Sequence, residues 1–88
     1  MYTVYVIYST AYDKIYIGFT SNIVARIQSH NSPKNSGYTK RFQPWTLVYS
    51  EQFDTKSMAM KREKELKSSK GRDFIRNKII SLINISVN

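Results

Sequence analysis

Two short runs of β-branched and aromatic residues open the chain and lie only four residues apart. Residues 2–9 read YTVYVIYS and residues 14–19 read KIYIGF, a composition that fits a pleated, half-buried strand better than a helix. The intervening TAYD segment is typical of a turn. The chain is therefore expected to begin with a β-hairpin.

The register of this hairpin follows if its loop spans Thr10–Asp13. Tyr5 then lies opposite Gly18, and Ile7 lies opposite Tyr16. Because side chains alternate along a strand, these four residues share one face and the two tyrosines become diagonal neighbours. The other face is apolar and carries Val4, Val6, Tyr8, Ile15 and Ile17.

The rest of the sequence predicts three helices and one more strand. Ser21, Asn22 and Thr55 are helix N-cap types, and Gly71 is expected to interrupt the last helical region. The expected elements are a helix of about ten residues after Asn22, a loop at 31–44, a strand at 45–51, a helix at 56–69 and a helix at 72–83. The face of the helix at 56–69 that carries Met58, Ala59, Arg62 and Leu66 is expected to pack on the sheet. The last helix is expected to be amphipathic, with an apolar face of Phe74, Ile75, Ile79 and Leu82. The order β-β-α-β-α-α predicts an α+β fold, with a small three-stranded antiparallel sheet flanked by helices.

Length and composition limit the class of protein. Eighty-eight residues suit one small domain, which we expect to span 1–84, with a short frayed tail at 85–88. The absence of cysteine excludes disulfides and thiolate metal sites, and a single histidine argues against zinc. The N-terminus lacks a secretion signal, and no apolar run approaches the roughly 20 residues of a membrane span. We therefore expect a cytoplasmic protein.

The chain is strongly basic. Fourteen Lys and Arg against six Asp and Glu give a net charge of +8, and residues 56–78 hold nine of the basic and three of the acidic side chains. Such a concentration of positive charge attracts polyanions, whose phosphates it can neutralise. A solvated helical surface would have the same composition, so charge alone leaves both interpretations open.

Several polar residues converge on the Tyr5 face of the hairpin. Tyr16 shares that face, and Arg26 and His30 lie four residues apart on the helix that follows. Gly18, opposite Tyr5, is expected to leave space in which a phosphate can approach the backbone. Each residue taken alone has an ordinary explanation in packing or solvation. Their combination predicts a site that handles phosphate.

This combination resembles the GIY-YIG nuclease family, in particular its small stand-alone members related to the nuclease domain of a bacterial excision-repair protein. The matching motifs are TVY at 3–5, YIG at 16–18, the SNIVARIQSH helix and the AMKREKELK run around Glu63, in family order. The resemblance implies hydrolysis of DNA phosphodiester bonds with a divalent ion held by Glu63. One glutamate suffices for a single Mg²⁺ or Mn²⁺, because such ions keep several waters and bind substrate phosphate.

The resemblance also implies a role for each site residue. Tyr5 is expected to act as general base and Tyr16 to orient water or phosphate, and nothing in the sequence prevents the two tyrosines from exchanging these roles. Arg26 would neutralise developing charge, and His30 would assist proton transfer. Asn77 matches an asparagine that the family often places at the site near the end of the domain.

Lys40 and Arg41, which precede the third strand, would add nonspecific contacts to the DNA backbone. We therefore expect a Mg²⁺-dependent endonuclease that is weakly sequence-specific or structure-selective, with a role in DNA repair or recombination. Its partners would be DNA, branched or damaged, and a protein that supplies specificity. The alternative is a non-catalytic DNA- or RNA-binding module that uses the same basic surface. A third interpretation is a protein-interaction partner that lends a nuclease module to a larger complex.

Overall fold

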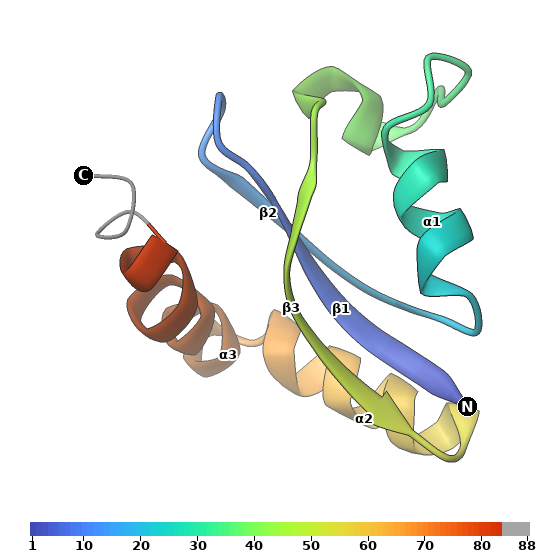
Figure 1. Ribbon diagram of the computed structural model, residues 1–88. Coiled ribbons are helices and arrows are strands. Elements are labelled where there is room, and N and C mark those ends of the chain that lie inside the picture. Colours follow the sequence, from blue (N-terminus) through green and yellow to red (C-terminus); the bar gives the residue numbers. More distant parts are fainter. Residues whose placement is uncertain (84–88) are drawn as a thin grey trace.

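A three-stranded antiparallel sheet forms the centre of the computed structural model, which describes residues 1–83 (Figure 1). Strands β1 (Tyr2–Ser9), β2 (Lys14–Thr20) and β3 (Thr46–Phe53) lie in the order β2-β1-β3, so the first strand is central. The α+β class and the element order β-β-α-β-α-α are confirmed. The tail predicted at 85–88 lies outside the described residues.

The hairpin of β1 and β2 has the predicted register. Tyr5 pairs with Gly18 and Ile7 pairs with Tyr16. On its other side β1 pairs antiparallel with β3, with a register shift after Val6. The central strand is therefore hydrogen-bonded along both edges, which fixes the side of the sheet to which each of its side chains points.

The tip of the hairpin is tied to the C-terminal part of the chain. Asp13 closes the turn with φ of 52°, in the left-handed region that Asp tolerates better than most residues. Its carboxylate accepts hydrogen bonds from the Tyr8 hydroxyl and from the Arg76 guanidinium, both at 2.8 Å. The turn residue thus joins segments that are 63 positions apart.

The N-cap at Thr55 is confirmed, and of the two candidates for the first helix Asn22 is the cap. The Asn22 side chain accepts a hydrogen bond from the backbone N–H three residues on and begins α1 (Ile23–His30). Thr55 does the same for α2 (Lys56–Lys67). Figure 1 shows α1 on one side of the sheet and α2 on the other.

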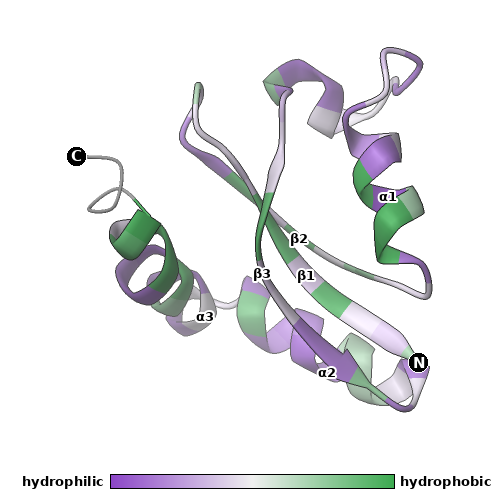
Figure 2. Ribbon diagram, in the orientation of Figure 1, coloured by the Kyte–Doolittle hydropathy of each residue, from purple (hydrophilic) through white to green (hydrophobic). Residues whose placement is uncertain are grey.

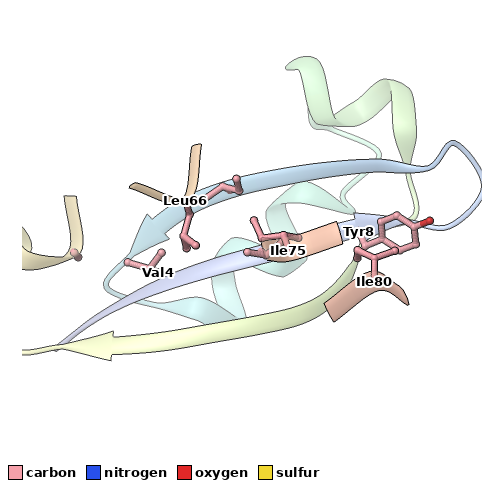
Figure 3. Close-up of a cluster of buried hydrophobic side chains, with 8 residues drawn as sticks. Val4, Tyr8, Leu66, Ile75 and Ile80 are labelled. Carbon is pink, nitrogen blue, oxygen red and sulfur yellow. The ribbon is translucent and has the colours of Figure 1, made fainter. Parts of the chain in front are cut away.

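The two faces of the sheet bury separate clusters. The α2 face holds Val4, Val6, Tyr8, Ile17, Ala59, Leu66, Ile75 and Ile80 (Figure 3). The α1 face holds Tyr5, Ile7 and Trp45, against which Ile23 and Ile27 pack. Figure 2 shows hydrophobic residues along the centre of the sheet and a largely hydrophilic α2. No helix among residues 1–83 is both long enough and apolar enough to span a bilayer.

The buried face of α2 differs from the predicted one. Ala59 and Leu66 are buried as predicted, but Met58 remains 52 % exposed. Arg62 reaches across to the Glu51 carboxylate of β3, with Nη2 and Oε2 3.0 Å apart. The prediction was wrong for Met58, because the helix meets the sheet through a narrow apolar stripe bordered by an ion pair.

The break after α2 lies at Ser68 rather than at Gly71. Ser68 is extended, with φ of −69° and ψ of 167°, and its side chain caps α3 (Ser69–Phe74). Gly71 lies inside α3, where an added Cβ would meet the carbonyl oxygen of Glu65 and would lie 2.5 Å from Leu66 Cα. The glycine therefore permits a close approach of two helices, which is a different role from the predicted interruption.

Replacement of Gly71 by alanine is expected to destabilise the fold by about 1–3 kcal/mol, because the added methyl group meets backbone atoms that cannot rotate away. Urea unfolding followed by circular dichroism measures the change. Gly37→Ala is the matched control, since its Cβ would meet only Asn35 Oδ1 at 3.4 Å. Its stability is expected to change by less than about 1 kcal/mol. Equal losses in the two variants would contradict this role for Gly71.

A π-helical segment changes the phase of the last helical region. The predicted helix over 72–83 is instead α3, then the π-helix η2 (Ile75–Ile80), then a short helical turn. A π-helix has more residues per turn than an α-helix and hydrogen bonds from i to i+5, and Ile75 and Ile80, five residues apart, are both buried. Leu82, which an α-helical period predicted to be buried, is 63 % exposed. The prediction of one regular helix was wrong for this reason.

Candidate active site

Tyr5, Tyr16 and His30 come together on the α1 side of the sheet. The two tyrosine rings, from neighbouring strands, have centroids 6.4 Å apart. His30 ends α1 and packs edge-on against Tyr16 at 4.9 Å, with Tyr5 at 5.8 Å. It lies seven residues after Ile23, on the face of α1 that packs on the sheet, and is therefore buried. The structure brings three of the predicted site residues into one cluster.

A chain of hydrogen bonds runs inward from this cluster. The Tyr5 hydroxyl oxygen lies 2.9 Å from His30 Nε2, and His30 Nδ1 lies 3.0 Å from Thr39 Oγ1. Thr39 Oγ1 also accepts a bond from Asn35 Nδ2 at 2.7 Å. Thr39 is buried but was not predicted, because a single threonine in a polar loop has no distinctive pattern.

The segment that carries Thr39 is held by side-chain N–H donors. It includes the short 3-10 helix η1 (Tyr38–Phe42), where the sequence predicted a loop. Gln43 Nε2 donates to the His30 carbonyl oxygen at 2.8 Å, and Trp45 Nε1 donates to the Thr39 carbonyl oxygen at 2.7 Å. Thr39 and His30 are thereby fixed relative to one another.

Burial keeps both hydrogen-bonded groups of the cluster neutral. It raises the pKa of Tyr5 well above the ordinary value, and the neighbouring Tyr16 adds to this effect. Arg26 acts in the opposite direction on the Tyr5 pKa, but burial outweighs it. Burial, with Arg26 nearby, lowers the pKa of His30. A neutral His30 can accept the Tyr5 proton at Nε2 if Nδ1–H donates to Thr39.

Gly18 leaves room for the side chain of Tyr5. A Cβ at this position would lie 2.6 Å from the Tyr5 hydroxyl oxygen. The space that we expected to admit a phosphate is instead filled by the phenol of Tyr5, which extends across its strand partner. A glycine is therefore needed at position 18 to make room for the Tyr5 side chain. The prediction that Gly18 leaves an opening for phosphate was wrong.

Arg26 and Glu63 lie near the cluster on different helices. Arg26 is exposed on α1, and Glu63 of α2 has a side chain that is 21 % exposed. The two charges change the Tyr5 pKa in opposite directions, so both lie within electrostatic range of the Tyr5 hydroxyl. Glu63 Oε1 pairs with Lys67 Nζ at 3.4 Å. A cavity of about 350 Å³ along β2 is lined by both Lys67 and Tyr16.

The donor set suits a weakly held, hydrated cation. Among residues 1–83 there is no group of three or more His, Cys, Asp or Glu side chains that could hold a metal ion by themselves. One partly exposed carboxylate, paired with a lysine that lines the cavity, fits Mg²⁺ or Mn²⁺, which retain waters and bind substrate phosphate. Glu63 is the carboxylate within electrostatic range of Tyr5, and it could hold such an ion.

The structure places the other three predicted substrate-binding residues on η1 and η2. Lys40 Nζ donates to the Pro33 carbonyl oxygen at 2.8 Å, and the Arg41 guanidinium lies 5.8 Å from the centre of the Phe42 ring. Asn77 is exposed on η2, whose buried residues belong to the α2-face cluster. η2 packs on the face of the sheet opposite Tyr5, as does α2, the helix that carries Glu63.

Several known proteins are similar to this chain in sequence, and a solved structure is similar in fold. The family model described as the GIY-YIG catalytic domain matches residues 1–78. UPF0213 protein SH2523 of Staphylococcus haemolyticus is 48 % identical over 56 residues, covering 64 % of this chain and 68 % of the relative. UPF0213 protein NP_0776A of Natronomonas pharaonis is 43 % identical over 65 residues, covering 74 % and 75 %. The solution NMR structure of UPF0213 protein BH0048 from Bacillus halodurans is 30 % identical, with a TM-score of 0.52, and the match covers 88 % of this chain and 84 % of that one.

Proposed function

The chain belongs to the GIY-YIG catalytic domain family, a family of nucleases, and on that premise we propose that it is an endonuclease that hydrolyses DNA phosphodiester bonds. The observation that carries the proposal is the hydrogen bond between the Tyr5 hydroxyl and His30 Nε2 within a cluster that also contains Tyr16. The net charge of +8 supports a polyanionic substrate. The proposed setting is DNA repair or recombination in the cytoplasm, with a protein partner that supplies specificity.

In the proposed reaction, the Tyr5 oxygen takes a proton from the attacking water while the Tyr5 proton passes to His30 Nε2. The water oxygen forms a bond to phosphorus, and the bond from phosphorus to the leaving oxygen breaks. This paired transfer avoids a free phenolate, which the raised pKa of Tyr5 disfavours. Thr39 supports it by accepting a hydrogen bond from His30 Nδ1–H, which keeps Nε2 free as the acceptor.

Arg26 and Tyr16 would act on the phosphate. Arg26 is exposed beside the cluster, and its guanidinium can pair with two phosphate oxygens as negative charge develops. No hydrogen bond joins the Tyr16 hydroxyl to any other of the described residues, so it is available to water or phosphate. Glu63 would hold Mg²⁺ or Mn²⁺, which supplies Lewis-acid stabilisation of charge on the phosphate or the leaving oxygen when bound.

Cleavage is expected to fail at acid pH as His30 becomes protonated. A protonated His30 cannot accept the Tyr5 proton, and burial lowers the pKa of His30 below its ordinary value of 6.5. Activity should therefore persist at neutral pH and be lost as pH falls through a midpoint below about 6.5. Rates measured from pH 4.5 to 8 at saturating Mg²⁺ test this. An acidic limb centred above 6.5 would contradict the proposed role.

The direct test is incubation of the purified chain with supercoiled, branched and single-stranded DNA in Mg²⁺ or Mn²⁺. Nicked or cleaved products that disappear on addition of EDTA are expected. Arg26→Ala should lose most of this activity, whereas Lys61→Ala, which removes an exposed cation from α2, is the matched control. Salt-sensitive DNA binding without products on any of these substrates would refute the nuclease and favour a binding module.

A further inference from the structure

A group of aromatic and cationic side chains lies between the hairpin loop and η1. Phe42 is at its centre, with the Tyr12 ring 5.5 Å away and the Tyr38 ring 5.0 Å away. Lys14 Nζ and Arg41 Cζ lie 5.6 and 5.8 Å from the centre of the same Phe42 ring. We call these five residues the aromatic platform. Figure 1 shows the hairpin tip and η1 at the same end of the sheet.

The platform holds two large rings in place but does not bury them. Tyr12 is 53 % exposed and Tyr38 is 54 % exposed. Phe42 is half-buried and packs against the α1-face cluster, so it anchors both tyrosines to the core. Fixed rings with open surfaces beside cations are the arrangement on which successive bases of a single strand stack.

The platform continues directly into the proposed active site. Tyr38 and Tyr16 line the same cavity along β2, of about 350 Å³. Lys67 and Arg72 are its charged lining residues. A DNA strand that extends from the cluster at Tyr16 along this cavity would therefore contact Lys67 and Arg72 and then the exposed ring of Tyr38.

The charges around the platform favour a nucleic acid over a protein segment as the molecule that binds there. The platform and the cavity together present four cations, which are Lys14, Arg41, Lys67 and Arg72. The nearby Asp13 carboxylate is already paired with Arg76 at 2.8 Å. This balance favours a phosphate backbone with exposed bases.

We propose that the aromatic platform binds an unpaired single-stranded segment of the DNA substrate next to the bond that is cut. Bases stack on Tyr12 and Tyr38, while Lys14 and Arg41 contact phosphates. Bases within a duplex are stacked on each other and are not available to these rings, so the platform selects DNA with a single-stranded arm. The inference rests on the proposed function, whose substrate class it names.

Binding without cleavage tests the platform. Fluorescence anisotropy in EDTA compares a blunt duplex with the same duplex carrying a single-stranded arm. The native protein should bind the armed duplex more tightly, and Tyr38→Ala should weaken that binding about tenfold while changing blunt-duplex affinity less than about twofold. Tyr38→Phe retains the ring and should bind as the native protein does. Met60→Ala, which removes another exposed apolar side chain, is the matched control and should have no effect.

A direct readout of stacking completes the test. 2-Aminopurine placed in the arm should lose fluorescence on binding to the native protein and should recover it with Tyr38→Ala. Equal affinity of the native protein for blunt and armed duplexes would overturn the inference, even if the protein cuts DNA. Stacking on Tyr38 without cleavage of any substrate would uphold the platform and refute the proposed nuclease.

Discussion

Replacement of Glu63 by glutamine is expected to reduce metal-dependent cleavage by at least about 100-fold, equivalent to about 2.7 kcal/mol of transition-state stabilisation. Glutamine has nearly the same size but no charge, and Glu63 is the carboxylate that acts on the Tyr5 pKa. The fold should tolerate the change. The lost pair with Lys67, at 3.4 Å, joins residues one helical turn apart and contributes only about 0.2–0.5 kcal/mol.

Two measurements separate loss of metal binding from other effects. Cleavage rates over a Mg²⁺ titration give activity, and Mn²⁺ binding followed by electron paramagnetic resonance gives affinity without DNA. Glu65→Gln is the matched control, because Glu65 is exposed on the same helix two residues later. We expect it to cleave and to bind Mn²⁺ as the native protein does. Native Mn²⁺ affinity in Glu63→Gln would contradict the assignment.

Tyr5→Phe is expected to lower the rate of cleavage by about 10²–10⁴-fold, the usual contribution of a general base. The hydroxyl that is removed is the one hydrogen-bonded to His30 Nε2 at 2.9 Å. Tyr16→Phe should have a smaller effect, because Tyr16 contacts His30 only through its ring. Single-turnover cleavage at saturating protein measures both variants under the same conditions.

The unfolding free energy must be measured alongside these rates. Phenylalanine fills the space of Tyr5, but it leaves His30 Nε2 buried without its partner, a loss of about 1–3 kcal/mol. A folded Tyr5→Phe protein with little activity would support the general base. A larger loss of activity in Tyr16→Phe would reverse the roles of the two tyrosines, which the sequence alone left open.

The hairpin and its two faces were predictable because a strand has a simple period. Once Thr10–Asp13 is taken as the loop, every pair of residues follows, and the pairing of Tyr5 with Gly18 is confirmed. Because successive side chains of a strand point to opposite faces, the same alternation places Tyr5 on one face of the sheet and Val4 on the other. The N-caps at Asn22 and Thr55 were also predictable, because a side-chain oxygen at that position satisfies a free backbone N–H.

Features that depend on close approach between distant segments were not predictable. The role of Gly71 arises from backbone atoms of α2 that meet it only in the folded chain. The π-helix at 75–80 has no sequence signature, and it changes which isoleucines are buried. Thr39 joins the candidate site through a hydrogen bond to His30 across nine residues. Asn77 was expected at the site from family order, although its segment packs on the opposite face.

If the aromatic platform binds DNA as proposed, the bond between Arg76 and Asp13 gives the last helical region a mechanical role in that binding. Asp13 directly follows Tyr12, so the guanidinium that holds the hairpin tip also restrains one ring of the aromatic platform. The helical region that carries Arg76 packs on the far face of the sheet and acts as a brace. The rigidity of the hairpin tip thus depends on a contact with the segment that packs on the far face of the sheet. This contact would limit how far the platform moves away from a bound DNA strand.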